Sequence, residues 1–364
     1  MDPNDSEKSG SPGESLLQTE SFGEVLSLLR KSMPPGTSIE TVTPLEGDAS
    51  DRRYFRIRYR VDPSARAAAA ILMRLANPWA PEERRPDLPF VNVARHLSEK
   101  GLPVPRILVD AAREGFVLLE DAGDATLQQA LRACAATERR ARYREAVDLL
   151  VRMQREASKP SGSPCYALQF AFDGETFFRE LCFFADHAIE GLWKKKMRAP
   201  DRVEMEALFH DLCRKVADLP RVFTHRDYHS RNLMVRPGGL LMLDFQDARL
   251  GPYTYDLASL LLDSYVALEP QEQEDLLLYY CEGSSRGGAD FGRRARIREE
   301  LARTGLQRNL KAIGTFAYQA VVRKNERYLP YVPGTVCSVR RTLERYEDLT
   351  PLRKLLEKYV EGLS

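Results

Sequence analysis

The segment 222–247 constrains this chain more than any other, because two short apolar runs within it are joined by a turn signal. Leu233–Val235 and Leu240–Leu243 flank the sequence Arg-Pro-Gly-Gly, which predicts a β-hairpin. A hairpin brings its two ends together, since neighbouring strands lie about 4.7–4.9 Å apart. Asn232, just before the first strand, and Asp244, just after the second, are therefore expected to meet. Magnesium takes oxygen ligands and usually only one or two protein carboxylates, so we predict that Asn232 and Asp244 bind a magnesium ion.

A polar loop leads into this hairpin, with the sequence His225-Arg226-Asp227-Tyr228-His229-Ser230-Arg231-Asn232. The spacing from Asp227 to Asn232 matches the catalytic loop of protein kinases, where the Asp accepts the hydroxyl proton and the Asn holds a metal. Together with Asp244-Phe245-Gln246-Asp247, the loop resembles the aminoglycoside phosphotransferase and choline kinase superfamily. The resemblance implies an α+β, bilobal protein-kinase-like fold with a small, mainly β N-lobe and a larger, mainly α C-lobe. It also implies ATP and Mg²⁺ as cofactors and Asp227 as the catalytic base.

The remaining polar residues of this segment have competing interpretations. His229 stands where a protein kinase would carry Lys, and it is assigned either to nucleotide binding or to a structural role. His225 is interpreted as structural, and Asp256 as a brace for the loop. Asp247 is expected to orient the substrate or bind a second magnesium ion, with a turn cap as the alternative. The residues assigned to the substrate side of this segment are Asp247, Gln246 and Arg231.

The composition of the chain favours a cytoplasmic enzyme. Its 364 residues allow two lobes, and the 43% hydrophobic fraction is sufficient for substantial cores. A net charge of +1 predicts neither nucleic acid nor a membrane as partner. The six cysteines are scattered and are expected to be reduced, mostly buried thiols. We find no apolar run of membrane-spanning length and no signal pattern.

We expect a disordered leader (1–20), an N-lobe (21–119), a hinge (120–124) and a helical C-lobe (125–364). The leader is rich in Pro, Asp, Ser, Gly and Glu, a composition typical of disorder. Strands are predicted from β-branched and aromatic content at 39–44, 54–59, 68–75, 106–109 and 116–119. Helices are predicted from position 22, at 90–100, and at 138–155, 175–194, 201–217, 256–267 and 301–320.

ATP also requires a loop for its phosphates, and the candidate lies between the first two predicted strands. Its residues are Gly47, Asp48, Ala49 and Ser50, whose backbone N–H groups can approach phosphate oxygens; an ordinary hairpin turn is the alternative. The third strand carries Met73 and Arg74 where most relatives place a phosphate-pairing Lys. Arg74 is therefore the candidate cation, with a solvated strand residue as the alternative, and no acidic partner is obvious on helix 90–100. Glu120 and Asp121 of the hinge are assigned to nucleotide binding.

Longer segments narrow the resemblance to one branch. The segments 47–56, 225–234, 244–252 and 306–316 resemble the bacterial anomeric sugar kinases that act on N-acetylmuramate and N-acetylglucosamine in cell-wall recycling. This implies phosphate transfer from ATP to the C1 hydroxyl and a sugar-1-phosphate uridylyltransferase as the downstream partner. Gln307 and Lys311 share a helix face and are candidates for binding an acidic sugar, with an exposed helix as the alternative.

Two rival functions remain open. The first is a kinase of another small molecule, such as an aminoglycoside or a choline-like amino alcohol. A binder of polycationic aminoglycosides would line its pocket with carboxylates, for which Glu180 and Asp186 are candidates. A pseudokinase would bind ATP without turnover, and the absent strand Lys favours it. The intact Asp227, Asn232 and Asp244 argue against it.

Overall fold

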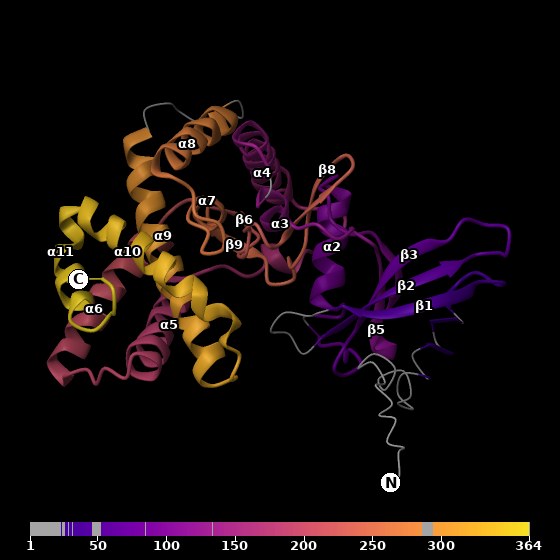
Figure 1. The fold of residues 1–364 in the computed structure, drawn as a ribbon, viewed down its shortest axis with the longest axis horizontal. Helices are drawn as coiled ribbons and strands as arrows, with labels where there is room; N and C mark the ends of the chain where they lie inside the picture. The colour runs from indigo at the N-terminus through magenta and orange to yellow at the C-terminus, as the bar shows by residue number, and fades with distance from the viewer. Residues whose placement is uncertain are drawn as a thin grey trace, which may run out of the picture. The chain divides into compact units, whose positions relative to one another are not determined.

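The computed structural model describes residues 23, 26–27, 29–30, 32–45, 52–83, 85–132, 134–285 and 294–363. The chain divides into two compact units (Figure 1). Unit 1 comprises the described residues up to Ala94 together with Pro105–Ala122, and unit 2 comprises Arg95–Val104 and the described residues from Gly123 onward. The predicted leader (1–20) and the predicted phosphate loop with Gly47, Asp48, Ala49 and Ser50 lie outside the described residues.

Unit 1 is built on a five-stranded antiparallel sheet in the order β1-β2-β3-β5-β4. In β2 the buried Phe55 and Ile57 alternate with more exposed arginines, as expected for a strand with one face on a core. The register places Phe55 opposite Leu72, and both pack into one core with Leu118. All five predicted strands are confirmed. They are β1 Ser38–Leu45, β2 Arg53–Arg60, β3 Ala68–Arg74, β4 Ile107–Ala111 and β5 Phe116–Glu120, with the short helix η2 (Ala112–Glu114) between the last two.

Unit 2 is mainly helical, and its core is formed by aromatic and aliphatic side chains of several helices. At its centre the rings of Phe172, Phe177 and Tyr255 stack with centroids 5.0–5.9 Å apart. The longer helices are α4 Ala136–Ala157, α5 Gly174–Phe184, α6 Ala199–Ala217, α8 Pro270–Ser285, α9 Arg294–Val321 and α10 Val332–Arg345. The shorter ones are α3 Leu127–Leu131, η3 Tyr166–Leu168, η4 Ala185–Leu192, α7 Tyr255–Leu261, η6 Glu326–Tyr331, η7 Glu347–Leu349 and α11 Thr350–Glu357. Helix α2 (Pro89–Glu99) begins in unit 1 and ends in unit 2.

Two small sheets complete unit 2. One pairs β6 (Arg221–Thr224) with β9 (Arg249–Pro252), and the other is the predicted hairpin of β7 (Leu233–Arg236) and β8 (Gly239–Met242). At the turn of the hairpin, Gly238 and Gly239 have φ angles of 95° and 120°, which explains the two glycines there.

Several predicted helices differ from the observed ones. The helix predicted at 256–267 ends at Leu261, because the next residues turn away and the Asp263 carboxylate accepts a hydrogen bond from the N–H of Tyr265 (2.8 Å). The helix predicted at 175–194 becomes a π-helix after Phe184, and the one predicted at 301–320 already begins at Arg294. The predictions missed α8, α10 and α11. In α8 the buried Leu276, Leu277, Tyr280 and Cys281 occupy only part of a mainly polar helix, which gives a weak periodic signal.

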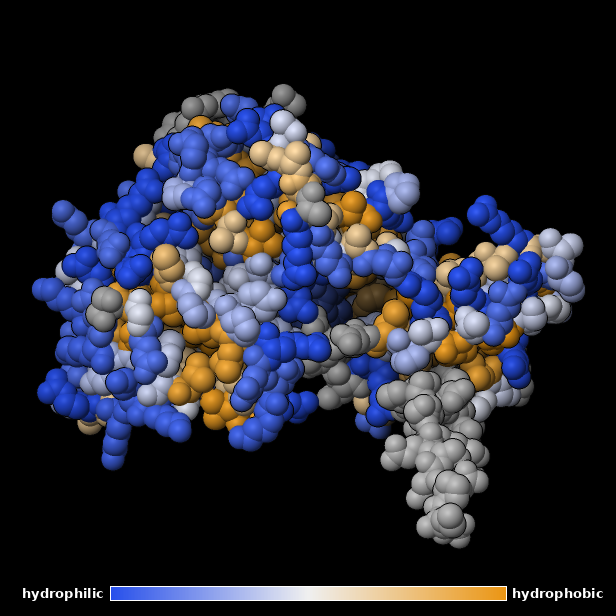
Figure 2. Space-filling view, in the orientation of Figure 1, coloured by the Kyte–Doolittle hydropathy of each residue, from blue (hydrophilic) through white to orange (hydrophobic). Residues whose placement is uncertain are grey.

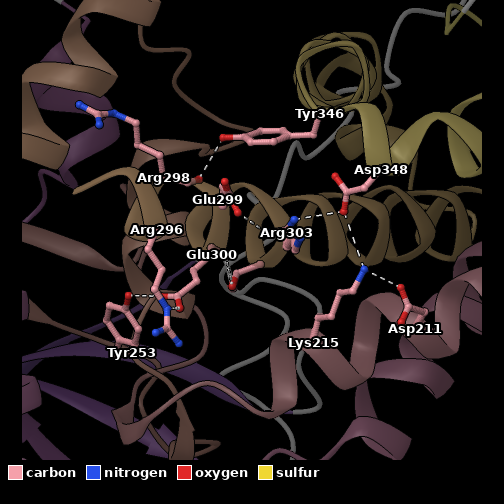
Figure 3. Close-up of polar contacts among 11 residues, drawn as sticks. Asp211, Lys215, Tyr253, Arg296, Arg298, Glu299, Glu300, Arg303, Tyr346 and Asp348 are labelled. Carbon is pink, nitrogen blue, oxygen red and sulfur yellow. Dashed lines mark hydrogen bonds and ion pairs between the residues drawn. The ribbon is translucent and has the colours of Figure 1, made fainter. Parts of the chain in front are cut away.

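A polar network ties the C-terminal end of the chain to α6 and α9 (Figure 3). Asp348 of η7 lies 3.1 Å from Nη2 of Arg303 and 3.7 Å from Nζ of Lys215. Arg303 also binds Glu299 (3.2 Å), and Lys215 binds Asp211 (2.7 Å). These side chains are partly exposed, so each pair contributes little alone, but the shared Asp348 links two helices of the same core.

Hydrophilic residues cover most of the visible face of unit 2, with apolar patches between them (Figure 2). Throughout the described ranges, none of the helices combines the length with the apolar composition that a membrane span requires.

Helix α9 lies against α5 so closely that only glycine fits at position 314. A Cβ added to Gly314 would meet Cα of Phe184 at 2.7 Å and its backbone nitrogen at 3.0 Å. We expect Gly314→Ala to lower the free energy of unfolding by about 1–3 kcal/mol, because backbone atoms cannot move aside as a side-chain end can. The midpoint of thermal unfolding measures the effect.

Gly334→Ala is the matched control for this prediction. Gly334 lies in α10, and a Cβ there would have open space around it. Alanine stabilises an exposed helix by up to about 1 kcal/mol relative to glycine, so this variant should unfold at the parent's midpoint or slightly above it. A Gly314→Ala variant as stable as the parent would contradict the close packing of α5 and α9.

Candidate active site

The loop that carries Asp227 begins where β6 ends, and Asp256 of α7 holds its first two residues. The Asp256 carboxylate accepts hydrogen bonds from the backbone N–H groups of His225 (2.6 Å) and Arg226 (2.9 Å). Arg226 has a φ of 84°, an unfavourable backbone conformation for a residue other than glycine, which these bonds help to hold. Asp256 is buried. Its interpretation as a brace for the loop is therefore confirmed.

Other contacts hold the rest of the loop. Ser230 donates its N–H and its hydroxyl to the Asp263 carboxylate (3.0 and 2.6 Å), and the Tyr228 hydroxyl donates to the carbonyl of Ala146 (2.8 Å). Nδ2 of Asn232 donates to the carbonyl of Asp227 (2.9 Å) and closes the loop on itself. Asp263 was missed by the sequence analysis, because it lies in what was predicted as the interior of a helix.

The hairpin brings Asn232 and Asp244 together, as predicted. β7 and β8 pair from Leu233 opposite Met242, and the N–H of Leu243 donates to the carbonyl of Asn232 (2.8 Å). Asp244 has a φ of 61°, and its Oδ1 accepts a hydrogen bond from Gln246 (2.7 Å). Because Nδ2 of Asn232 is used within the loop, its Oδ1 is the atom suited to a cation.

The donor set fits one hard divalent cation. Across the described residues, no three His, Cys, Asp or Glu side chains gather into a group that could hold a metal. An amide oxygen and one carboxylate instead match the demand of Mg²⁺, which leaves most positions to water and phosphate oxygens. Asn232 and Asp244 as metal ligands stay a prediction.

Asp227 faces a lysine from α9. Nζ of Lys311 lies 3.6 Å from Oδ1 of Asp227. Burial alone would raise the pKa of the Asp227 carboxyl, but Lys311 and other nearby cations hold it below its ordinary value. Burial would lower the pKa of Lys311, but Asp227 keeps it above the ordinary value for lysine. Near neutral pH both groups are therefore charged.

Glu180 of α5 joins the loop to α9. Its Oε1 lies 3.0 Å from Nη2 of Arg226, and its Oε2 accepts a hydrogen bond from Nε2 of Gln307 (2.9 Å). Gln307 is fully buried and Arg308 is 5% exposed, with Nε of Arg308 donating to Ser259 (2.5 Å). The alternative of an exposed helix at 307–311 is therefore wrong.

Burial lowers the pKa of both histidines of the loop. Burial and the nearby Arg308 lower the pKa of His229 to about 3, and its ring lies edge-on to that of Tyr265 with centroids 5.0 Å apart. Burial also lowers the pKa of His225, whose ring lies edge-on to Tyr228. This environment agrees with a structural role for His225.

The three residues assigned to the substrate side lie in different surroundings. The Arg231 guanidinium lies over the rings of Tyr265 (4.8 Å) and Tyr328 (5.7 Å). Gln246 donates to Asp244, as described above, and Asp247 is exposed. None of these contacts tests substrate binding, so the three assignments stay predictions.

Three nucleotide-binding candidates, Arg74, Glu120 and Asp121, lie at the sheet of unit 1. Arg74 ends β3, opposite Phe116 of β5, and the preceding Met73 is buried. Asp121 forms a two-pronged ion pair with Arg56 of β2 (2.7 and 3.0 Å), and Glu120 accepts from Arg106 (3.3 Å). Arg56 was missed as a partner for Asp121, because nothing in the local sequence of β2 links it to the end of β5.

The chemistry of unit 2 defines the class of protein. An ionised carboxylate such as Asp227 can orient a hydroxyl and accept its proton. When an Asn and an Asp at the ends of a hairpin bind one cation, they occupy only two of its coordination positions. The remaining positions can be taken by phosphate oxygens. An antiparallel sheet followed by a helical unit with this loop is the protein-kinase-like arrangement, so the chain is a phosphotransferase.

The chain belongs to the phosphotransferase enzyme family, whose family model matches residues 41–299. It is 31% identical over 318 residues to the N-acetylmuramate/N-acetylglucosamine kinase of Neisseria meningitidis, covering 86% of this chain and 89% of the relative. It is also 31% identical over 354 residues to the enzyme of the same name from Pseudomonas aeruginosa, covering 95% of this chain and 93% of the relative.

Solved structures confirm the expected α+β, protein-kinase-like fold. The ethanolamine kinase of Plasmodium vivax superposes with a TM-score of 0.58 at 12% identity, covering 91% of this chain and 96% of the other. An ADP-bound aminoglycoside phosphotransferase superposes with a TM-score of 0.54 at 14% identity, covering 90% and 98%. At such identities the likeness concerns the fold alone.

Proposed function

We propose that this chain transfers the γ-phosphoryl group of ATP to the anomeric hydroxyl of N-acetylmuramate or N-acetylglucosamine. The observation that carries the chemistry is the charged Asp227, on a loop whose Asn232 is brought to Asp244 by the β7–β8 hairpin. The choice of sugar is supported by relatives of that name at 31% identity over most of the chain.

In this mechanism Asp227 orients the sugar hydroxyl for in-line attack and accepts its proton. Its lowered pKa makes it a weak base, which suits a loose transition state in which the proton leaves late. Asn232 and Asp244 hold Mg²⁺, which when bound neutralises charge on the phosphate oxygens. Catalysis then consists mainly of positioning and electrostatics.

The other assigned residues retain their proposed roles. On the nucleotide side these are Gly47, Asp48, Ala49, Ser50, Arg74, Glu120, Asp121 and His229, and on the sugar side Arg231, Gln246, Asp247 and Gln307. Lys311, the remaining candidate, lies beside Asp227. The reaction belongs in the cytoplasm, where ATP is available. Its sugar-1-phosphate product would be consumed by a uridylyltransferase.

A kinase of another small molecule is the second candidate, since the fold is shared with ethanolamine and aminoglycoside kinases. A site for a polycationic acceptor needs carboxylates without cationic partners. Glu180 is instead paired with Arg226 and hydrogen-bonded to Gln307, and Asp186 is paired with Arg202 (2.9 Å). Because both carboxylates already have cationic partners, they favour an amino sugar over a polycationic acceptor as the substrate.

With ATP and magnesium, we expect N-acetylmuramate or N-acetylglucosamine to become the 1-phosphate and not the 6-phosphate. Phosphorus NMR identifies the product, and the 1-O-methyl glycosides serve as matched acceptors with C1 blocked. Equal phosphorylation of free and blocked sugars would exclude C1. Turnover of an aminoglycoside or choline alone would favour the second candidate, and turnover of no acceptor in such a panel would favour a pseudokinase.

A further inference from the structure

Transfer of a phosphoryl group to a hydroxyl needs positive charge near the transferred group, because negative charge spreads over its oxygens. The loop around Asp227 supplies little of it. Arg226 is paired with Glu180, and Arg231 lies over two tyrosine rings. A side-chain cation beside Asp227 that would act together with the magnesium ion therefore has to come from another element.

Lys311 of α9 is that cation. Its Nζ lies 3.6 Å from Oδ1 of Asp227, longer than the ~2.7–2.9 Å of a charge-assisted hydrogen bond. The ammonium is thus attracted to the carboxylate without a short hydrogen bond to it, and its N–H groups remain available to an oxygen placed beside both groups. The side chains of Lys311 and Asp227 are 19% and 32% exposed, so the pair is only partly screened by water.

The position of Lys311 is fixed by the packing of its helix. Leu310 is fully buried, and Gly314, one turn further along α9, lies against the backbone of Phe184. On the loop side, Gln307 is bound to Glu180, which also pairs with Arg226. A charge held in this way needs no reorganisation during the reaction, which is the condition for strong electrostatic stabilisation.

We propose that Lys311 is a catalytic residue whose ammonium contacts the phosphoryl group during transfer, and that it does not serve to bind the carboxylate of an acidic sugar. The proposal rests on the proposed function. The hydroxyl oxygen held by Asp227 forms a bond to the γ-phosphorus, while the bond from that phosphorus to the β,γ-bridging oxygen breaks. The electron pair leaves with ADP, the hydroxyl proton passes to Asp227, and Lys311 keeps its proton.

The two sugars separate this role from sugar binding, because N-acetylmuramate is acidic and N-acetylglucosamine is neutral. We expect Lys311→Met to lower kcat about 10²–10³-fold for both sugars, the usual cost of losing one stabilising group at a developing charge, with little change in KM. Lys311→Arg should recover part of kcat, and the exposed Lys196→Met is the control with full activity. A raised KM for N-acetylmuramate alone would overturn the proposal.

A binding measurement provides a second readout that does not depend on turnover. Calorimetry would measure two affinities of the protein. The first is for ADP alone, and the second is for ADP together with the sugar and aluminium fluoride, where the fluoride imitates the phosphoryl group during transfer. We expect Lys311→Met to bind ADP like the parent but to lose the additional affinity for the fluoride complex. If the parent and Lys311→Met bind ADP equally well and also bind the fluoride complex equally well, the catalytic role of Lys311 is overturned.

The failure of the proposed function can be told apart from the failure of this inference. If the parent phosphorylates neither sugar, the proposed function is wrong. The slow hydrolysis of ATP, in which water replaces the acceptor at Asp227, then decides the role of Lys311. Hydrolysis unchanged in Lys311→Met would overturn it, and a loss comparable to that expected for kcat would support it.

Discussion

Asp227→Asn should lower kcat by about 10²–10⁴-fold, the usual range for removal of a general base, while the fold and nucleotide binding are retained. The substitution keeps the size of the side chain but removes the carboxylate that faces Lys311 at 3.6 Å. The backbone carbonyl of residue 227 still accepts the hydrogen bond from Asn232, so the loop should keep its closed form. Steady-state turnover and calorimetric binding of ADP measure the two effects.

Asp186→Asn is the control for this variant. Asp186 lies in the same unit, but it is paired with Arg202 of α6 and its side chain is 52% exposed. It should leave turnover within twofold of the parent's. Near-normal turnover of Asp227→Asn would remove Asp227 from the mechanism.

Features that depend on short stretches of chain were predicted from the sequence. The hairpin that brings Asn232 to Asp244 needs only two apolar runs and a turn with two glycines. The strands of unit 1 were predicted from their β-branched and aromatic residues, among them Phe55 and Ile57 of β2, both of which are buried. The interpretation of Asp256 as a brace came from the resemblance to known kinases, and two backbone hydrogen bonds confirm it.

Contacts between distant side chains were not predicted, because they depend on how helices and strands pack. Glu180 is 46 residues from Arg226 and 127 residues from Gln307, yet it binds both. Arg56 and Asp121 are 65 residues apart. The alternative of an exposed helix near Gln307 is wrong for the same reason, since α9 packs against α5, α7 and α10.

Asp244→Ala should abolish detectable magnesium-dependent nucleotide binding, whereas Asn232→Ala should only weaken it. Asp244 contributes a negative charge to the predicted magnesium site, and Asn232 contributes a neutral amide oxygen. A divalent cation loses more attraction when a charged ligand is removed than when a neutral one is. The difference between the two variants is measured by titrating magnesium at a fixed nucleotide concentration and recording binding by calorimetry.

Asp244→Asn separates charge from shape in this experiment. It keeps a side chain of the same size, with an oxygen that can still accept the hydrogen bond from Gln246, so the hairpin end should remain in place. We therefore expect it to bind magnesium more weakly than the parent but more strongly than Asp244→Ala. Nucleotide binding without magnesium should be alike in all variants, since none of them alters unit 1. Equal magnesium titrations for the parent, Asp244→Ala and Asn232→Ala would show that the β7–β8 hairpin does not build the metal site.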